Sequence, residues 1–171
     1  MDPAYHREFK AQAIFRMEEK RTHIAKCLHQ LDETELWWRP NASSNSVGNL
    51  LLHLAGNIGQ YILSSLANQP DTRQRAAEFA ATDGFRKAEA WELLDTTISQ
   101  ACAAIAACPA GEMLRVRKVQ GFEFSGLGVV LHVVEHLSYH TGQIAYLVKW
   151  RQDQPLGLYD DFDLNTLNEP D

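Results

Sequence analysis

The amino-acid sequence predicts an all-α protein, a four-helix bundle with a short extended or hairpin segment before the last helix. Four long stretches carry apolar residues at helical spacing, over residues 4–30, 47–67, 87–108 and 127–150. Only residues 113–124 alternate apolar and charged side chains in the manner of a strand. Four such helices can bury their apolar faces against one another without a large sheet, which is the arrangement of a bundle.

Length and composition predict one domain spanning residues 1–171. The net charge of −6 argues against nonspecific binding to nucleic acid, which needs a basic face. No apolar run reaches the length of a membrane span, so we expect no membrane partner. Cys27, Cys102 and Cys108 are an odd set without a CxxC motif. We therefore expect a cytoplasmic protein with buried, structural thiols.

The second predicted helix begins after Ser46, a residue type well suited to cap a helix N-terminus. It runs to about residue 67 and contains Gly48, Gly56 and Gly59. Each glycine costs a helix roughly 1 kcal/mol relative to alanine. A helix that accepts three of them usually has a close backbone neighbour or a bound group beside it.

One predicted helix precedes the second helix in the sequence, and an irregular connection and a third helix follow it. The apolar stripe of the first helix, residues 4–30, includes Phe15. Residues 68–84 form a polar, irregular connection that is long for two helices, so it either covers a pocket or is a plain crossover. The third helix, residues 87–108, ends before Pro109.

The extended segment, residues 113–124, carries the one basic cluster of the chain, Arg115, Arg117 and Lys118. We interpret this cluster as a solvated strand face, with contact to an anionic substrate as the alternative. Ser125 follows and is the expected cap of the last helix.

The last helix carries His132, His136 and His140, which lie four residues apart. Side chains at this spacing lie one above the next on nearly the same face. Because each step overshoots a full turn by roughly 40°, neighbouring histidines can share one ligand but all three cannot. Two histidines four apart on a helix are a known way to bind a transition metal. The best third ligand is His53, within the apolar second helix.

Bundle interiors build metal sites from side chains on facing helices. His53 and a pair from the last helix would give three neutral imidazoles, which suit zinc, nickel, iron or manganese without selecting among them. Three protein ligands leave a coordination position open, and this is the pattern of a catalytic site. Spacing alone does not decide between the pair His132/His136 and the pair His136/His140.

The stretch EHLSYHTGQI, residues 135–144, resembles the last helix of the DinB-like superfamily. The family pattern His-x-x-x-His-x-Gly-Gln is matched at all four fixed positions, starting at His136. The family's third ligand is a histidine of the second helix, which His53 resembles in kind and placement. The resemblance implies a bundle with an internal divalent metal held by His53, His136 and His140, often as a homodimer.

Members of this superfamily include metal-dependent thiol S-transferases and mycothiol-dependent isomerases. The resemblance therefore implies an enzyme in which a low-molecular-weight thiol, activated by the metal, attacks an electrophile. One alternative is a non-catalytic metal-binding bundle with a closed coordination shell, and another is a bundle whose histidines are core residues that bind no metal. The sequence assigns no catalytic residue.

Several neighbours of the three histidines could shape a pocket, namely Asn57, Tyr61, Tyr139 and Gln143. Gln143 could also form a hydrogen bond to one of the metal-binding histidines without contacting the metal itself. His132 has no place in the family pattern, and we expect it in the core or beside the ligands.

Overall fold

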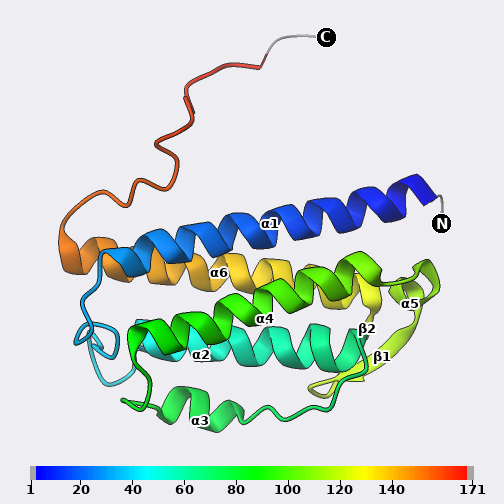
Figure 1. Cartoon of the computed structure of the whole chain (residues 1–171), viewed down its shortest axis with the longest axis horizontal. Coiled ribbons are helices and arrows are strands. Elements are labelled where there is room, and N and C mark those ends of the chain that lie inside the picture. The colour runs from blue at the N-terminus through cyan, green and yellow to red at the C-terminus, as the bar shows by residue number, and fades with distance from the viewer. Residues whose placement is uncertain (1–2, 169–171) are drawn as a thin grey trace.

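The computed structural model describes residues 3–168, and the other five residues of the predicted domain lie outside the described part. The long helices are α1 (Pro3–His29), α2 (Val47–Ile58) with its π-helical continuation η1 (Gly59–Leu66), α4 (Lys87–Ala107) and α6 (Gly126–Gln152). Both α1 and α2 pack against α4 and α6, which closes the bundle (Figure 1). The predicted all-α bundle is confirmed.

Four shorter elements complete the chain: α3 (Arg75–Ala80), α5 (Ala110–Leu114), β1 (Val116–Val119) and β2 (Phe122–Ser125). The two strands pair antiparallel, with Val119 opposite Phe122. Gln120 and Gly121 form the turn with positive φ angles of 51° and 85°, as a two-residue hairpin requires. This confirms the predicted hairpin, whereas α3 and α5 are too short to leave a periodic pattern and were not predicted.

Both predicted serine caps are present. The Ser46 hydroxyl accepts a hydrogen bond from the backbone N–H of Asn49 at 3.1 Å, and the Asn49 side chain accepts one from the Ser46 N–H. The Ser125 hydroxyl accepts from the N–H of Gly128 at 3.1 Å. These caps fix where α2 and α6 begin, and so the level at which their histidines face each other.

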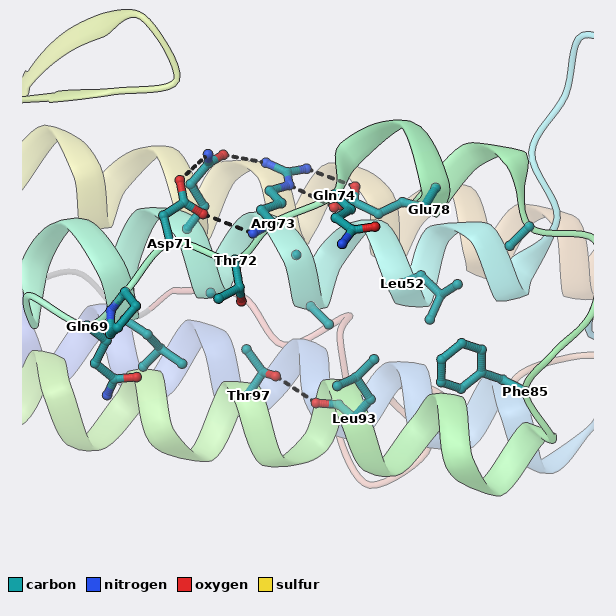
Figure 2. Close-up of a pocket in the computed structure, with 18 residues that line it drawn as sticks. Leu52, Gln69, Asp71, Thr72, Arg73, Gln74, Glu78, Phe85, Leu93 and Thr97 are labelled. Carbon is teal, nitrogen blue, oxygen red and sulfur yellow. Dashed lines mark hydrogen bonds and ion pairs between the residues drawn. The ribbon is translucent and has the colours of Figure 1, made fainter.

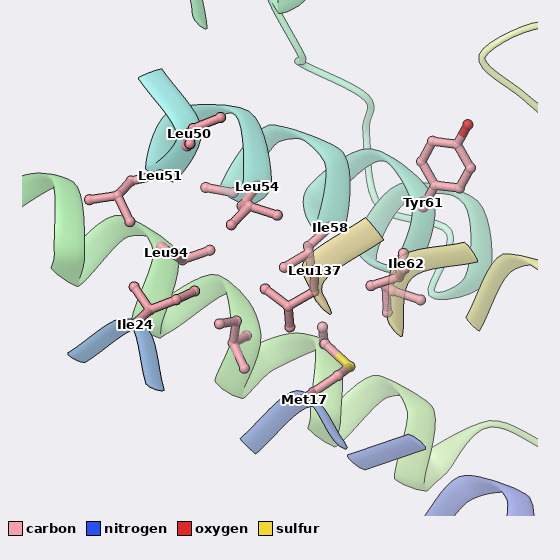
Figure 3. Close-up of a cluster of buried hydrophobic side chains, with 14 of the residues drawn as sticks. Met17, Ile24, Leu50, Leu51, Leu54, Ile58, Tyr61, Ile62, Leu94 and Leu137 are labelled. Atoms are coloured by element: carbon pink, nitrogen blue, oxygen red, sulfur yellow. The ribbon is translucent and has the colours of Figure 1, made fainter. Parts of the chain in front are cut away.

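The core lies between the four long helices, and each contributes fully buried apolar side chains (Figure 3). Met17 and Ile24 come from α1, and Leu137 comes from the core face of α6. The prediction for Phe15 is wrong, because its side chain is 57% exposed. Two helical residues are roughly 200° of rotation, so Phe15 points away from the bundle while Met17 points into it.

Arg117 departs from its prediction as a solvated side chain, since it is 7% exposed. Its guanidinium donates to the carbonyl oxygens of Ser65 at 3.1 Å and Glu112 at 2.5 Å. Backbone carbonyls at two helix ends therefore hold this cation, which ties the hairpin to η1.

Cys27, Cys102 and Cys108 are buried and free of disulfide bonds, as predicted. Burial raises the pKa of Cys27 to about 11, so its thiol stays protonated at neutral pH. Within residues 3–168, the helices include none with the length and apolar character needed to cross a membrane.

Candidate metal centre

Three imidazole rings meet where α2 faces α6. The Nε2 atom of His136 lies 3.2 Å from Nε2 of His53 and 3.2 Å from Nε2 of His140. One ligand atom of each ring lies within 4.8 Å of the other two. Nitrogens bound tetrahedrally to one ion at about 2.1 Å are roughly 3.4 Å apart, so the observed spacing fits a shared ion. The three-histidine group could hold a metal.

The outer nitrogen of His53 faces a carboxylate from a different element. His53 Nδ1 lies 2.9 Å from Oε2 of Glu78 on α3, and both side chains are buried. Because an ionised carboxylate only accepts, the Nδ1–H donates to it and leaves the Nε2 lone pair directed at the other histidines. A carboxylate in this position orients a metal-binding histidine and raises its basicity.

Glu78 is itself held by an extended network. Arg73 donates to its two carboxylate oxygens at 2.8 and 3.0 Å, and Arg73 also donates to Gln60, which donates to Asp71 (Figure 2). Burial alone would raise the pKa of Glu78, but the hydrogen bonds from Arg73 and His53 outweigh it and lower the pKa. Glu78 therefore stays ionised at neutral pH.

Gly56 makes room for this carboxylate. A Cβ atom at Gly56 would lie 2.1 Å from Oε1 of Glu78, far inside van der Waals contact. Gly48 has a comparable neighbour, since a Cβ there would lie 2.8 Å from the Trp37 ring, whereas Gly59 has nothing within 4 Å. The expectation of close neighbours holds at Gly48 and Gly56 but not at Gly59.

The outer nitrogen of His140 has a local partner. His140 Nδ1 lies 2.7 Å from the amide oxygen of Gln143, one turn further along α6. The amide oxygen accepts, so the Nδ1–H donates and Nε2 is again the free nitrogen. Gln143 thus takes the position expected from the sequence. Nδ1 of His136 is buried without a hydrogen-bond partner among residues 3–168.

The electrostatics favour neutral imidazoles at His136 and His140. Burial, together with the neighbouring rings of His140 and His53, lowers the pKa of His136 to about 3. Burial also lowers the pKa of His140. Neutral imidazole is the form that binds metal ions, so these rings need not lose a proton first.

A pocket of about 380 Å³ opens beside the histidines. It is lined by His53, Asn57, Tyr61, Arg73, Arg75, Gln120, Phe122, His132 and His136. His132 stacks on Tyr61 with ring centroids 4.2 Å apart, and its Nε2 lies 3.4 Å from the Asn57 amide nitrogen. His132 is therefore a wall of this pocket and lies outside the three-histidine group.

The sequence prediction for the pocket residues is correct for Asn57 and Tyr61. Tyr139 and Gln143 instead line a different hollow of about 560 Å³ between α6 and the loop that precedes α2. A third pocket, of about 670 Å³, lies on the far side of Arg73 and Glu78, between α2 and α4 (Figure 2). Residues 69–74 line it, so the connection after η1 covers a pocket and is more than a plain crossover.

Sequence reasoning missed Glu78 and Arg73, which come from the polar connection between α2 and α4. It also missed Gln120 and Phe122, which the hairpin brings to the pocket. The one available signal was Gly56, whose cost in a helix indicated that some group approaches it closely.

This arrangement, a four-helix bundle with histidines from its second and last long helices turned toward each other, defines a DinB-like protein. In agreement, the chain superposes on the crystal structure of a DinB-like protein, YjoA, from Bacillus subtilis, with a TM-score of 0.63. The match covers 82% of this chain and 91% of that one at 15% sequence identity, which establishes the common fold.

Comparison with protein-family models assigns the chain to a particular family. The family model for mycothiol-S-transferase matches residues 15–149, and the chain belongs to this DinB-like family. A search of curated proteins finds no match to the sequence.

Proposed function

We propose that His53, His136 and His140 hold a divalent transition metal and that the protein is a metal-dependent transferase acting with a small thiol. The observation that carries the metal site is the convergence of three Nε2 atoms, two of them 3.2 Å from the third. Membership of the mycothiol-S-transferase family supports the thiol.

The ion, when bound, would lower the pKa of a thiol at its open position and so supply a thiolate at neutral pH. The chain's own residues prepare this position. Glu78 and Gln143 fix the rings of His53 and His140, and burial keeps the imidazoles of His136 and His140 neutral. Among residues 3–168, no fourth His, Cys, Asp or Glu joins the group, which leaves room for an external ligand.

In the transfer that we propose, the sulfur supplies an electron pair to an electrophilic carbon. A carbon–sulfur bond forms while the bond to the leaving group breaks, and the leaving group departs with its electron pair. The thiol proton is released to solvent before attack. The pocket walls formed by Asn57, Tyr61 and His132 would hold the electrophile against the sulfur.

The alternative is a bundle whose metal only stabilises the fold. The pocket of about 380 Å³ beside the histidines favours the catalytic proposal, because structural metal sites are closed by protein ligands. The homodimer, the cytoplasmic location and the single domain stay predictions from the sequence.

The metal site is tested by elemental analysis of untagged protein, comparing wild type, His136→Ala and the exposed control His29→Ala. We expect near-stoichiometric metal in wild type and in the control, and its loss in His136→Ala. Wild-type protein that takes up no metal even after reconstitution would contradict the site.

The activity is tested by following thiol consumption with a panel of small thiols, mycothiol included, and an alkylating electrophile. Turnover by wild type that disappears on chelation and in His136→Ala would support the transferase. Full metal occupancy without turnover across the panel, combined with a large drop in Tm on chelation, would favour the stabilising role.

A further inference from the structure

We propose that Arg75 makes the pocket selective for electrophiles that carry a carboxylate. This inference deepens the proposed function and rests on it, because it assigns the class of the second substrate. It begins from the charges that line the pocket of about 380 Å³ beside the three histidines.

The pocket lining has a charge balance opposite to that of the chain. The protein has 22 acidic and 16 basic residues, yet the lining contains Arg73 and Arg75 and no Asp or Glu. Arg73 is neutralised by its buried ion pair with Glu78. Arg75 is therefore the one lining cation, among the described residues, without a carboxylate in ion-pair distance.

Arg75 is nevertheless held in place. Its guanidinium carbon lies 4.9 Å from the centre of the Phe79 ring, one turn along α3. The Phe79 ring in turn lies 4.7 Å from the ring of His53. Phe79 therefore contacts both the Arg75 cation and His53, a proposed metal ligand.

This contact with the ring is electrostatic and occupies no hydrogen-bond acceptor, and among residues 3–168 the Arg75 guanidinium donates no hydrogen bond, so its N–H groups are available to a ligand. Those N–H groups form a planar fork that matches a carboxylate and can bind it through two hydrogen bonds. Because Phe79 already restrains the side chain, less conformational entropy is lost when an anion binds.

The lining also contains an exposed apolar side chain. Phe122, on strand β2, lines the same pocket with 58% of its side chain exposed. A substrate that satisfies both features is a small acid with an apolar body. Its carboxylate would meet Arg75, its body would cover Phe122, and its reacting carbon would face the histidines.

The test is a chemical-shift titration of the full-length, ¹⁵N-labelled protein with phenylacetate and with phenylacetamide, which has nearly the same shape and no charge. Wild type, Arg75→Gln, Arg75→Lys and Arg16→Gln are compared, each zinc-loaded and metal-free. Arg16 is the control, because its guanidinium also lies over a phenylalanine ring, 5.5 Å from the centre of Phe15, and α1 contributes no residue to this pocket. Equal Tm values establish that the variants are folded.

We expect wild type to bind phenylacetate roughly fivefold more tightly than phenylacetamide, with or without zinc, as a charge-assisted hydrogen bond at an exposed site allows. Arg75→Gln should abolish this preference, Arg75→Lys should retain part of it, and Arg16→Gln should keep it all. A preference that persists in Arg75→Gln would overturn the proposal. A preference that disappears on zinc removal would also overturn it, because the metal would then be the anion site.

The metal-free titration separates this inference from the proposed function. A preference lost in metal-free Arg75→Gln supports the anion site even if no thiol is ever turned over. Thiol turnover by wild type with no carboxylate preference would leave the transferase standing and remove Arg75 from it.

Discussion

Glu78 and Gln143 each accept a hydrogen bond from the Nδ1–H of a histidine, His53 and His140 respectively, but their surroundings differ. Glu78 is 25 residues from His53, lies on another helix, is buried and carries a charge that Arg73 balances. Gln143 is three residues from His140, lies on the same helix, is exposed and is neutral. A buried, charged partner cannot be replaced by water, whereas an exposed amide can. The His53 side should therefore be the more sensitive of the two.

Removal of the Glu78 side chain should lower stability and metal affinity more than any other change proposed below. Glu78→Ala leaves Arg73 buried without its counter-charge, which typically costs about 3–5 kcal/mol of stability. It also frees the His53 ring, and loss of such a partner weakens metal binding by about 10–100-fold. Urea unfolding and zinc competition titrations measure the two effects.

Glu123→Ala is the control for this change, since Glu123 is 65% exposed in its surface pair with Lys118 and should matter little. Equal losses in Glu78→Ala and Glu123→Ala would show that the buried network does not support the site.

Gly56→Ala should act in the same direction with a smaller effect. The new Cβ would lie 2.1 Å from Oε1 of Glu78, so the carboxylate must withdraw from His53. We expect up to about tenfold weaker zinc binding. Alanine alone would stabilise the helix by about 1 kcal/mol, so a net loss of stability identifies the clash.

Gly59→Ala supplies the matched control, because nothing lies within 4 Å of that position. It should leave zinc affinity unchanged. If the two glycine variants behave alike, the close approach of Glu78 does not explain Gly56.

Gln143→Ala should weaken metal binding only a few-fold. Gln143 is exposed, so a water molecule can accept the hydrogen bond from Nδ1 of His140 in its place. The same zinc titration measures this change. A loss as large as that of Glu78→Ala would invert the comparison between the two partners.

The pH dependence of stability in metal-free protein should distinguish the roles of Glu78 and Gln143. The pKa of His136 is about 3 in the fold and about 6.5 in the unfolded chain, so the unfolded state takes up a proton first and stability falls as pH drops below 6.5. The pKa of Glu78 is also lowered, so stability falls further below its ordinary value of 4.5. Urea midpoints measured from pH 7.5 to about 3 report both changes.

Glu78→Gln should lose only the lower part of this acid dependence, and Gln143→Ala should lose neither part. An unfolding midpoint that stays constant below pH 6.5 would contradict the neutral state of the partly buried His136.

The sequence predicted those parts of the protein that rest on local, periodic patterns. Apolar spacing predicted the four long helices, and Ser46 and Ser125 predicted where two of them begin. The four-residue spacing and the family pattern identified the three histidines that meet between α2 and α6. The same local logic identified Gln143, because it lies one turn from His140 on the same helix.

The parts that were missed depend on contacts between distant segments. Six residues are too few for α3 to show periodicity, so Glu78 and Arg73 looked like ordinary polar residues of a connection. Arg117 looked exposed because the carbonyl groups that hold it belong to two other elements. A charged side chain reads as solvated until its distant partner is known.

The hairpin between α5 and α6 supplies pocket-lining residues that the helices carrying the histidines do not. The hairpin contributes Gln120 and Phe122 to the lining of the pocket, while the three histidines belong to α2 and α6. The proposed metal ligands thus belong to the helical bundle, whereas part of the lining that a substrate would contact belongs to a few residues of a surface ribbon. An engineer could exchange that ribbon to change which molecules enter while the histidine frame stays untouched.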